Sequence, residues 1–567
     1  MRKTLIAASA LPLLLTLAVV PTAAAAPALS GKTVEYNVLA ASENGAEAAA
    51  QAVRAAGGTV VKRNDEVGLL TVSAPENGFT QRMSQSRAVF SAARSRSVGK
   101  APNGKVTPDR NKVEKEGIGK ADKNKAAKPV GNDPLDDGQW GLKSVRSDLA
   151  RTKQPGDKRV KVGIIDTGVD GSHPDIKPNF DKALSRNFTR DIPFDELGQE
   201  VDGPCEYRGC VDPSDVDNGG HGTHVAGIIA AAANGFGLSG VAPGVTIVNV
   251  RAGQDSGFFF LQPTVDALTY AGDAGLDVVN MSFYVDPWLY NCDNNPADTP
   301  EQQAQQRTIK TAMIRALNYA HRKGVTLMSA YGNEHTDSGK PQPDATSPDY
   351  PANTAHTRTV DNSTCLSMPS EGPHVINVSS FGPSQAKADY STYGLENISV
   401  SAPGGYFRDG FGTPWFRSLD NEILSTYPLN VAQTEGLVDA AGNVTPDGVA
   451  AGVKVLNKDG VPAVYRPLQG TSMASPHATG VAALIVSQYG KYSGNKVSMD
   501  PDKVERVLEG TAAKIPCPTP RTVDYLKEGR DASYTATCEG TLDFNGFYGH
   551  GAVDAWAAVT RGAEFLK

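Results

Sequence analysis

The sequence predicts an α/β protein whose main unit is an open, mostly parallel sheet flanked by helices, preceded by a small α+β unit. From about residue 133 onward, short runs rich in β-branched residues alternate with helical patterns. This is the order expected of parallel strands joined by crossover helices. A stretch rich in Lys, Asn, Gly and Pro separates this part from an earlier compact one. Because 567 residues exceed the size of an ordinary domain, we expect two or three folded units.

The first 26 residues are typical of a secretory signal. Arg2 and Lys3 precede an apolar run from about Leu5 to Val20, and the segment "PTAAAAPA" predicts cleavage near Ala26. The alternative is a single membrane anchor, but the run is short and no basic residue follows it directly. We therefore expect a secreted, extracellular protein that has no membrane contact after signal cleavage.

Residues 27–98 are predicted to form the small α+β unit. "KTVEYNVLAA" alternates like a strand, and "GAEAAAQAVRAAGG" reads as an alanine-rich helix that ends at glycine. "TVVKRNDEVGLLTVSAP" predicts two short strands around a turn, and "FTQRMSQSRAVFSAARS" predicts a second helix.

Residues 99–132 are predicted to be a basic, flexible linker. The wider stretch of residues 91–130 carries eleven Lys/Arg against four Asp/Glu, whereas the whole chain has a net charge of −7. Positive charge could indicate nucleic-acid binding, but no aromatic residues are interleaved to stack on bases. We therefore expect an exposed spacer and no nucleic-acid partner.

Residues 133–567 are predicted to form the parallel-sheet domain. Helical patterns such as "TVDALTYAGDAG" and "TIKTAMIRALNYAHRKG" lie between the strand-like runs. The carboxyl ends of parallel strands meet at one edge of such a sheet, and functional groups collect there. The predicted strands are "VKVGIID", "TIVNVRA", "LDVVNMSF", "VTLMSA" and "HVINVSS".

Six cysteines form an even set in a chain that we expect to be exported, which favours disulfides over metal or redox chemistry. Many pairings are possible, and free buried cysteines are an alternative. Neighbours in sequence are the expected partners. The predicted pairs are Cys205–Cys210, Cys292–Cys365 and Cys517–Cys538.

Three polar residues at the ends of predicted elements are weak signals when taken singly. Asp166 ends a strand, where an acid is usually a turn or capping residue. His221 opens a predicted helix, and since the HExxH zinc spacing is missing, we expect His224 to be a packed, hydrogen-bonded residue. Ser472 opens the apolar helix that contains "ATGVAALIVSQY", where a serine is usually an N-cap.

Taken together, the three residues fit acyl transfer. A serine hydroxyl is a weak nucleophile, so a histidine must remove its proton while a carboxylate orients the imidazole. Asn333 follows the strand "VTLMSA" in "SAYGNE" and would lie at the same sheet edge. Its amide and the backbone N–H of Ser472 could donate to the oxyanion, although a turn asparagine is the alternative.

The segments "IIDTGVDGSHPDI", "HGTHVAGIIA", "VVNMS", "SAYGNE" and "GTSMASPHATGVAAL" closely resemble the subtilisin-like serine proteases, in particular the secreted bacterial type. The order Asp, His, Ser is the order of that family. The similarity spans roughly residues 131–562. It implies a subtilisin-like sheet and a serine endopeptidase that hydrolyses peptide bonds through an acyl-enzyme.

Carried over residue by residue, the resemblance makes Ser472 the nucleophile and His221 the general base and then acid. Asp166 becomes the orienting carboxylate and Asn333 the oxyanion donor. It implies polypeptide substrates, no cofactor for catalysis and a monomer. Because His221 must be neutral to act, we expect activity to fall on acidification through a pKa of about 6.5.

The small α+β unit resembles the ferredoxin-like N-terminal propeptide of these proteases. The resemblance implies a self-processed precursor whose propeptide acts as intramolecular chaperone and inhibitor. An exposed linker after a compact unit suits processing, because a protease can reach it. A permanent partner-binding domain is the alternative.

A structural calcium ion is a further expectation from the resemblance. Hard oxygen ligands in carboxylates, amides and carbonyls suit calcium rather than zinc. The alternative is an ordinary hydrogen-bonded loop with two solvated acids. The proposed ligands are Asp133, Asp175 and Asn234 through their side chains, and Ala232, Phe236 and Leu238 through their carbonyls.

The segment that lines the substrate groove departs from the Ser-Leu-Gly-Gly of many relatives, because side chains replace the glycines in "SFYV". Backbone pairing with an extended peptide is still expected. Insertions near residues 286–308 and at residues 405–468 could restrict access, and the second contains a predicted hairpin around "KDG". The predicted substrate-binding residues are Ser282, Phe283, Tyr284, Ser256, Gly257, Ser329, Ala330 and Gly332.

Two other functions stay open at this point. A catalytically silent binding protein on a protease scaffold is one, although all four chemical residues are present. An exopeptidase that trims short peptides is the other, since the insertions could close one end of the groove.

Overall fold

The computed structural model describes residues 32–95, 110–117, 133–195, 198–351 and 353–567. The predicted secretory signal and most of the predicted linker lie outside these residues. Among the residues described, no helix is both apolar and long enough to cross a bilayer.

A seven-stranded sheet forms the centre of the main domain, with the order β15-β14-β10-β8-β5-β7-β6 and every neighbouring pair parallel. The prediction of an α/β fold with a large parallel sheet is confirmed. All five predicted strands are present, because buried β-branched runs of this length fit a sheet covered on both faces. The strands are β5 (Lys161–Ile165), β6 (Arg186–Asn187), β7 (Thr246–Arg251), β8 (Val278–Met281), β10 (Thr326–Ala330), β14 (Val375–Phe381) and β15 (Val400–Pro403).

Helices cover both faces of this sheet, and alternate residues of each strand enter two separate cores. Ile164 and Val278 pack in a core with α6 (His221–Ala230) and α11 (Thr471–Tyr489). Ile165 and Val279 pack in the opposite core. The helices of that second core are α7 (Leu261–Asp273) and α8 (Pro300–Arg322).

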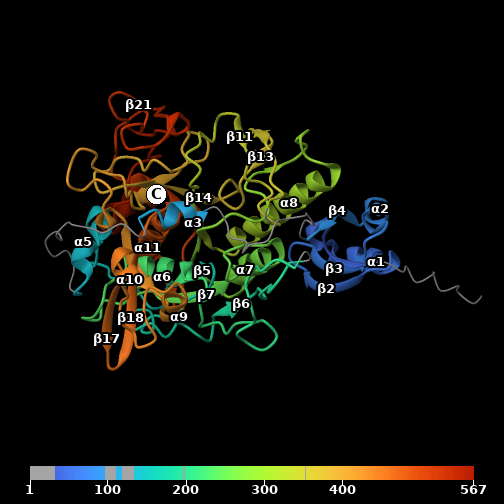
Figure 1. Ribbon diagram of the computed structural model, residues 1–567, viewed down its shortest axis with the longest axis horizontal. Helices are drawn as coiled ribbons and strands as arrows, with labels where there is room; N and C mark the ends of the chain where they lie inside the picture. The colour runs from blue at the N-terminus through green and yellow to red at the C-terminus, as the bar shows by residue number, and fades with distance from the viewer. Residues whose placement is uncertain (1–31, 96–109, 118–132, 196–197, 352) are drawn as a thin grey trace, which may run out of the picture.

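A four-stranded antiparallel sheet with two helices forms the α+β domain, which Figure 1 shows in blue. Its order β2-β3-β1-β4 is that of a ferredoxin-like sheet. The predicted second helix is wrong in its latter half: it ends at Ser84, and the β-branched and aromatic pair Val89-Phe90 begins an edge strand beside β1. The elements are β1 (Thr33–Ala40), α1 (Ala46–Ala55), β2 (Thr59–Asn64), β3 (Leu69–Pro75), α2 (Phe79–Ser84) and β4 (Val89–Arg94).

The α+β domain packs against α7 and α8 of the main domain. Leu39, Val67 and Leu69 are fully buried and join the core that these helices form. Asn64 Nδ2 donates to Asp266 Oδ1 at 2.8 Å, and Arg315 Nη1 donates to Val67 O at 3.0 Å. The contact therefore combines apolar burial with polar bonds, several of which are themselves buried.

Between residues 405 and 468 the chain forms a second small sheet, drawn in orange in Figure 1. Its three strands pair antiparallel, and the predicted hairpin around "KDG" is present between β17 and β18. His224 Nε2 on α6 bonds the carbonyls of Ile423 and Arg466, at 3.1 and 3.0 Å, and so joins the sheet to the helix. The elements are β16 (Ile423–Tyr427), α9 (Leu429–Thr434), α10 (Pro446–Ala450), β17 (Lys454–Lys458) and β18 (Val461–Leu468).

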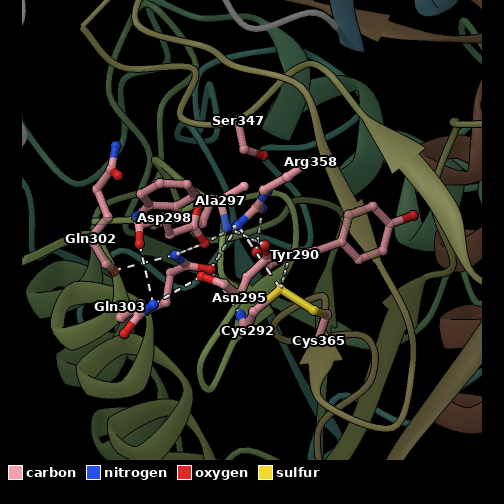
Figure 2. Close-up of polar contacts among 12 residues, drawn as sticks. Tyr290, Cys292, Asn295, Ala297, Asp298, Gln302, Gln303, Ser347, Arg358 and Cys365 are labelled. Atoms are coloured by element: carbon pink, nitrogen blue, oxygen red, sulfur yellow. Dashed lines mark hydrogen bonds and ion pairs between the residues drawn. A yellow bond between two sulfur atoms is a disulfide. The ribbon is translucent and has the colours of Figure 1, made fainter. Parts of the chain in front are cut away.

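The insertion before α8 is held by a disulfide and a buried arginine, as Figure 2 shows. Cys292 is bonded to Cys365, and Arg358 donates to Asp298 Oδ2 at 3.0 Å and to the carbonyl of Tyr290 at 2.7 Å. A buried guanidinium needs such partners, because an unpaired charge inside the protein is costly. The short strands here are β9 (Asn291–Cys292), β11 (Gln342–Asp344), β12 (Arg358–Val360) and β13 (Cys365–Leu366).

All three predicted disulfides are present, since Cys205 pairs with Cys210 and Cys517 with Cys538 as well. Part of the predicted linker is helical, because Arg110–Glu114 forms α3. The other elements of the main domain are α4 (Trp140–Ser144), α5 (Ser147–Ala150), β19 (Lys491–Ser493), β20 (Lys496–Ser498), α12 (Pro501–Thr511), β21 (Thr522–Val523), β22 (Ala536–Thr537) and α13 (Ala555–Arg561).

Candidate active site

Asp166 and His221 meet at the carboxyl edge of the parallel sheet. Asp166 follows β5 directly, and His221 is the first residue of α6. His221 Nδ1 lies 2.8 Å from Asp166 Oδ1, and both side chains are more than nine-tenths buried. This is the geometry in which a carboxylate fixes the tautomer and orientation of an imidazole.

A second carboxylate, that of Asp217, ties the end of β5 to the start of α6. Its Oδ1 accepts from Thr167 Oγ1 at 3.0 Å and from the backbone N–H of Gly220 at 2.8 Å. Its Oδ2 accepts from the N–H of Thr223 at 2.9 Å. Helix amides of the first turn have no intrahelical acceptor, so Asp217 satisfies them while it positions the helix. Sequence reasoning missed this residue.

The close approach of α6 to the strand end depends on Gly222. A Cβ on this residue would lie 2.1 Å from the carbonyl oxygen of Gly168, well inside van der Waals contact. The histidine of "HGTH" is therefore followed by a glycine for a steric reason, and a larger residue would push His221 away from Asp166.

Ser472 is the second residue of α11 and is 3% exposed. Its Oγ lies 3.5 Å from the carbonyl oxygen of Ser282, and Ser282 Oγ donates to the carbonyl of Ser472 at 3.1 Å. The N–H of Ser472 belongs to the first turn of α11, and the N-terminus of a helix favours nearby negative charge. Serine, histidine and aspartate thus come from three different elements.

Asn333 follows β10 at the same sheet edge, and Thr471 fixes its amide. Asn333 Oδ1 accepts from the N–H of Thr471 at 2.9 Å and from Thr471 Oγ1 at 2.8 Å. With the oxygen held in this way, the Nδ2 group is the part of the amide left to donate. Thr471 is therefore a positioning residue, and the sequence signal for it was its place immediately before Ser472.

The second ring nitrogen of His221 faces a carboxylate that sequence reasoning did not anticipate. Glu114, the last residue of α3, places Oε1 3.4 Å from His221 Nε2 and is 2% exposed. Burial acts to lower the pKa of His221, but the two carboxylates of Asp166 and Glu114 outweigh it and raise this pKa to about 10. An imidazole in this environment is protonated at neutral pH and cannot accept a proton.

Polar contacts hold the segment 112–117 against the catalytic edge (Figure 1, α3 beside α6 and α11). The N–H of Gln469 donates to the carbonyl of Glu114 at 3.3 Å, and Gln469 Nε2 donates to that of Val113 at 3.1 Å. Glu116 pairs with Arg408 at 2.5 Å and with Arg530 at 2.7 Å. The segment is therefore fixed by Gln469, Arg408 and Arg530 while Glu114 faces His221.

A small cavity of about 40 Å³ opens beside Ser472 and Asn333. Its walls include Tyr284 and Leu289, and the hydroxyl of Tyr284 donates to Asp349 Oδ2 at 2.7 Å. Burial raises the pKa of the Glu334 carboxyl in this wall to about 7. Of the predicted substrate-binding residues, the cavity is lined by Ser282, Phe283, Tyr284, Ala330 and Gly332.

The other predicted substrate-binding residues lie elsewhere. Ser329 is fully buried inside β10 and donates to the carbonyl of Met281 at 3.1 Å. Ser256 donates through its N–H and its hydroxyl to Asp202, at 2.9 and 2.7 Å, and is followed by Gly257, which has a φ of +94°. Phe283, which does line the cavity, stacks on Phe259 with 4.0 Å between ring centroids.

The predicted calcium ligands come together in one loop region near α6. Asp175 accepts from Asn234 Nδ2 at 3.1 Å and from the N–H of Leu238 at 3.0 Å, and its backbone carbonyl accepts from Ala232 at 2.8 Å. Asp133 Oδ1 accepts from Gly235 at 2.7 Å. The sixth predicted ligand is Phe236, whose N–H donates to Asn234 Oδ1 at 3.0 Å.

Several oxygens of this loop region have the chemistry of a hard-cation site. Asp133 Oδ2 is buried without a hydrogen-bond partner among the residues described. Burial raises the pKa of Asp175 to about 6, and burial with the charge of Asp136 raises that of Asp133. A cation would favour the ionised form of both acids, so the residues present fit calcium.

At one edge of the parallel sheet lie an aspartate–histidine pair, a serine at the start of a helix and an asparagine. This combination is typical of the serine hydrolases. The profile of the Subtilase family matches residues 157–551. The chain therefore belongs to the Subtilase family and is a subtilisin-like serine endopeptidase.

Individual relatives agree with this family. Subtilisin DY of Bacillus licheniformis is 26% identical over 358 residues, which are 63% of this chain and 88% of the relative. Thermitase of Thermoactinomyces vulgaris is 27% identical over 408 residues, 71% of this chain and 98% of the relative. The structure of the epidermin leader peptide processing serine protease from Staphylococcus aureus has the same fold, with a TM-score of 0.60 at 20% identity, over 94% of this chain and 99% of that one.

Proposed function

We propose that the protein is an exported endopeptidase, made as a self-processed precursor, that cleaves polypeptides through an acyl-enzyme formed on Ser472. His221 would remove the proton of the Ser472 hydroxyl and later return it to the leaving amine. Asp166 would orient the imidazole and stabilise its charged form. The observation that carries the proposal is the 2.8 Å contact between His221 Nδ1 and Asp166 Oδ1 at the sheet edge that also holds Ser472.

Asn333 and the N–H of Ser472 would stabilise the oxyanion. The bonds from Thr471 to Asn333 Oδ1 support this role, because they leave Nδ2 to donate without reorganisation during the reaction. Preorganised donors of this kind contribute about 10²–10³ in kcat. No cofactor is needed for these steps.

Covalent labelling tests the nucleophile and separates this proposal from a silent binding protein. A peptidyl phosphonate should phosphonylate the processed protein once per chain, on Ser472, and block peptide hydrolysis. Ser472→Ala should neither react nor hydrolyse, and a matched Ser475→Ala chain should retain labelling, since Ser475 bonds Asn280 instead of facing the cleft. Labelling elsewhere, or hydrolysis by Ser472→Ala, would contradict the assignment.

The α+β domain and the segment 112–117 together would form the inhibitory part of the precursor. The domain of residues 27–98 would assist folding through its apolar contact with α7 and α8. The segment would hold His221 protonated through Glu114 until the chain is cut. In this proposal the inhibitory carboxylate, that of Glu114, belongs to the region predicted as a linker and not to the α+β domain.

A calcium ion held by Asp133, Asp175, Asn234 and the carbonyls of Ala232, Phe236 and Leu238 would stabilise the mature domain. An ion that binds only the folded state raises the stability by an amount that grows with its concentration. Removing calcium with a chelator should lower the midpoint of thermal unfolding of the Ser472→Ala chain. Asp133→Asn should reduce this response, whereas Asp148→Asn, at a half-buried position in the first turn of α5, should leave it intact.

A further inference from the structure

The segment that follows β8 forms one wall of the path along which a substrate can lie. Ser282 Oγ donates to the carbonyl of Ser472 at 3.1 Å, and Ser282 and the two residues after it line the cavity beside Ser472. A peptide whose cleaved bond lies at Ser472 can therefore extend along this segment. Asp286 is four residues beyond Ser282, so the path to it is at most about 14 Å long.

The position of His221 decides which half of the substrate takes this path. His221 would return its proton to the leaving amine, so the half after the cleaved bond must begin beside its imidazole. His221 is not among the described residues that line the cavity, whereas Asn333 is. The half of the substrate before the cleaved bond therefore lies along the cavity and the segment after Ser282.

Contacts with Phe259 close this path at its far end. The N–H of Asp286 donates to the carbonyl of Phe259 at 2.8 Å, and the N–H of Phe259 donates to Asp286 Oδ2. The ring of Phe283 stacks on that of Phe259, with 4.0 Å between centroids and 2° between planes. Phe259 is fully buried and Phe283 is 6% exposed, and both belong to the core with α7 and α8. All three residues lie in the main domain, so removal of the N-terminal part of the chain does not remove them.

The residues just before Phe259 are also engaged within the protein. The sequence predicts that Ser256 and Gly257 bind an extended peptide. However, the N–H of Ser256 donates to Asp202 Oδ1 at 2.9 Å, and that of Gly257 donates to the carbonyl of Gln254 at 2.9 Å. A substrate could form a ladder with these groups only if the present bonds were broken.

We propose that the substrate site of this peptidase is closed on the amino side of the cleaved bond and recognises no more than about three residues there. About four residues of an extended peptide span the path from Ser282 to Asp286, so the fourth residue before the cleaved bond meets the contact between Asp286 and Phe259. Phe259 and Phe283 are thus specificity-determining residues. The inference rests on the proposed function, because it takes Ser472 as the nucleophile.

Peptides of different length before the cleaved bond test the proposal. The processed protein is given N-acetylated peptides that share one cleaved bond and the residues after it, and that have one to five residues before it. We expect kcat/KM to rise up to about the third residue and then to stay level within about twofold. A rise of about tenfold from the third to the fourth residue would overturn the closure alone. Absence of hydrolysis at every length would contradict the proposed function, and this inference with it.

Phe259→Ala should open the closed end, because it removes one of the two stacked rings. With leucine instead of glycine as the fourth residue before the cleaved bond, kcat/KM should rise about tenfold in this variant and stay level in the parent chain. Phe258→Ala is the matched control, since Phe258 is equally buried but packs in a separate core with Phe260 and Tyr350. The control should keep the level profile of the parent chain.

Phe283→Leu provides a second variant in case Phe259→Ala fails to fold. It removes the same ring stacking with a smaller loss of buried volume. We expect a smaller gain from leucine as the fourth residue, in the same direction. A level profile in a folded variant of either residue, or a gain with Phe258→Ala as large as that with Phe259→Ala, would contradict the role of the two rings.

Discussion

Within the part of the chain that the structure describes, two contacts hold N-terminal segments on the peptidase domain, and they differ in how much apolar side-chain surface they bury. The α+β domain buries Leu39, Val67 and Leu69 against α7 and α8. The segment 112–117 is held mainly by charged side chains and hydrogen bonds, and of these two contacts it is the one that reaches His221. The first contact is suited to attachment and the second to control of the chemistry.

This difference suggests that attachment and inhibition can be altered separately. Apolar burial is non-directional and scales with area, so it holds a domain without touching the reacting atoms. A carboxylate close to an imidazole raises the pKa of that imidazole, and the effect is confined to short distances. Three changes test the distinction, and we give them in order of expected effect.

Leu69→Ala should have the largest effect and should act on attachment. Removing a buried leucine costs about 2–5 kcal/mol, and Leu69 packs in the core with α7 and α8. In the Ser472→Ala chain, hydrogen exchange should rise at the face between the two domains. Leu70→Ala is the control, because Leu70 packs inside the α+β domain and its loss should unfold that domain itself. A matching loss of the Glu114 contact in Leu69→Ala would show that the two contacts are not separable.

Glu114→Gln should have the next largest effect and should act on the chemistry. Loss of this carboxylate removes one of the two charges that raise the pKa of His221 to about 10. The imidazole of the unprocessed chain then becomes neutral at lower pH, so phosphonate labelling of Ser472 should begin at lower pH. The labelling rate near neutrality should rise about tenfold for each pKa unit lost.

Glu116→Gln is the matched control for this change. It loosens the same segment from Arg408 and Arg530 without touching His221. We expect it to raise the labelling rate at every pH and to leave the pH profile in place. A shift of the profile with Glu116→Gln, or none with Glu114→Gln, would contradict the role of Glu114.

Salt should have the smallest effect. The pairs of Glu116 with Arg408 and Arg530 are only slightly exposed, so screening weakens them in part. Between about 0.05 and 0.5 M salt, labelling of the unprocessed chain should rise a few-fold, while the interface with α7 and α8 stays closed. Glu116→Gln should remove most of this dependence, and a response that persists in that variant would point to another contact.

The fold and the catalytic edge were predictable because their signals are local. Buried β-branched runs identified the five strands, and short motifs placed Asp166, His221, Asn333 and Ser472 at element ends. The cysteine pairs followed from proximity along the chain. In each case, residues close together in the sequence are enough to predict the element, the site residue or the disulfide.

The remaining features depend on contacts between distant segments. Glu114 lies in a basic, polar stretch, and nothing in its neighbourhood indicates that it reaches His221. The strand β4 was assigned to a helix because its sequence continues a helical pattern, and only pairing with β1 decides the matter. The cavity beside Ser472 is narrowed by Leu289, which belongs to an insertion without a motif.

Asp217 has a consequence for how this enzyme can vary. The carboxylate of Asp217 bonds both Thr167, next to Asp166, and the amides that precede His221. The distance between Asp166 and His221 therefore does not depend on the length of the loop segment between Gly168 and Val216. This segment, which contains the Cys205–Cys210 disulfide, can change in length or in surface residues without altering the contact between Asp166 and His221. Evolution thus has freedom to remodel this flank of the enzyme while the proton-transfer partners keep their distance.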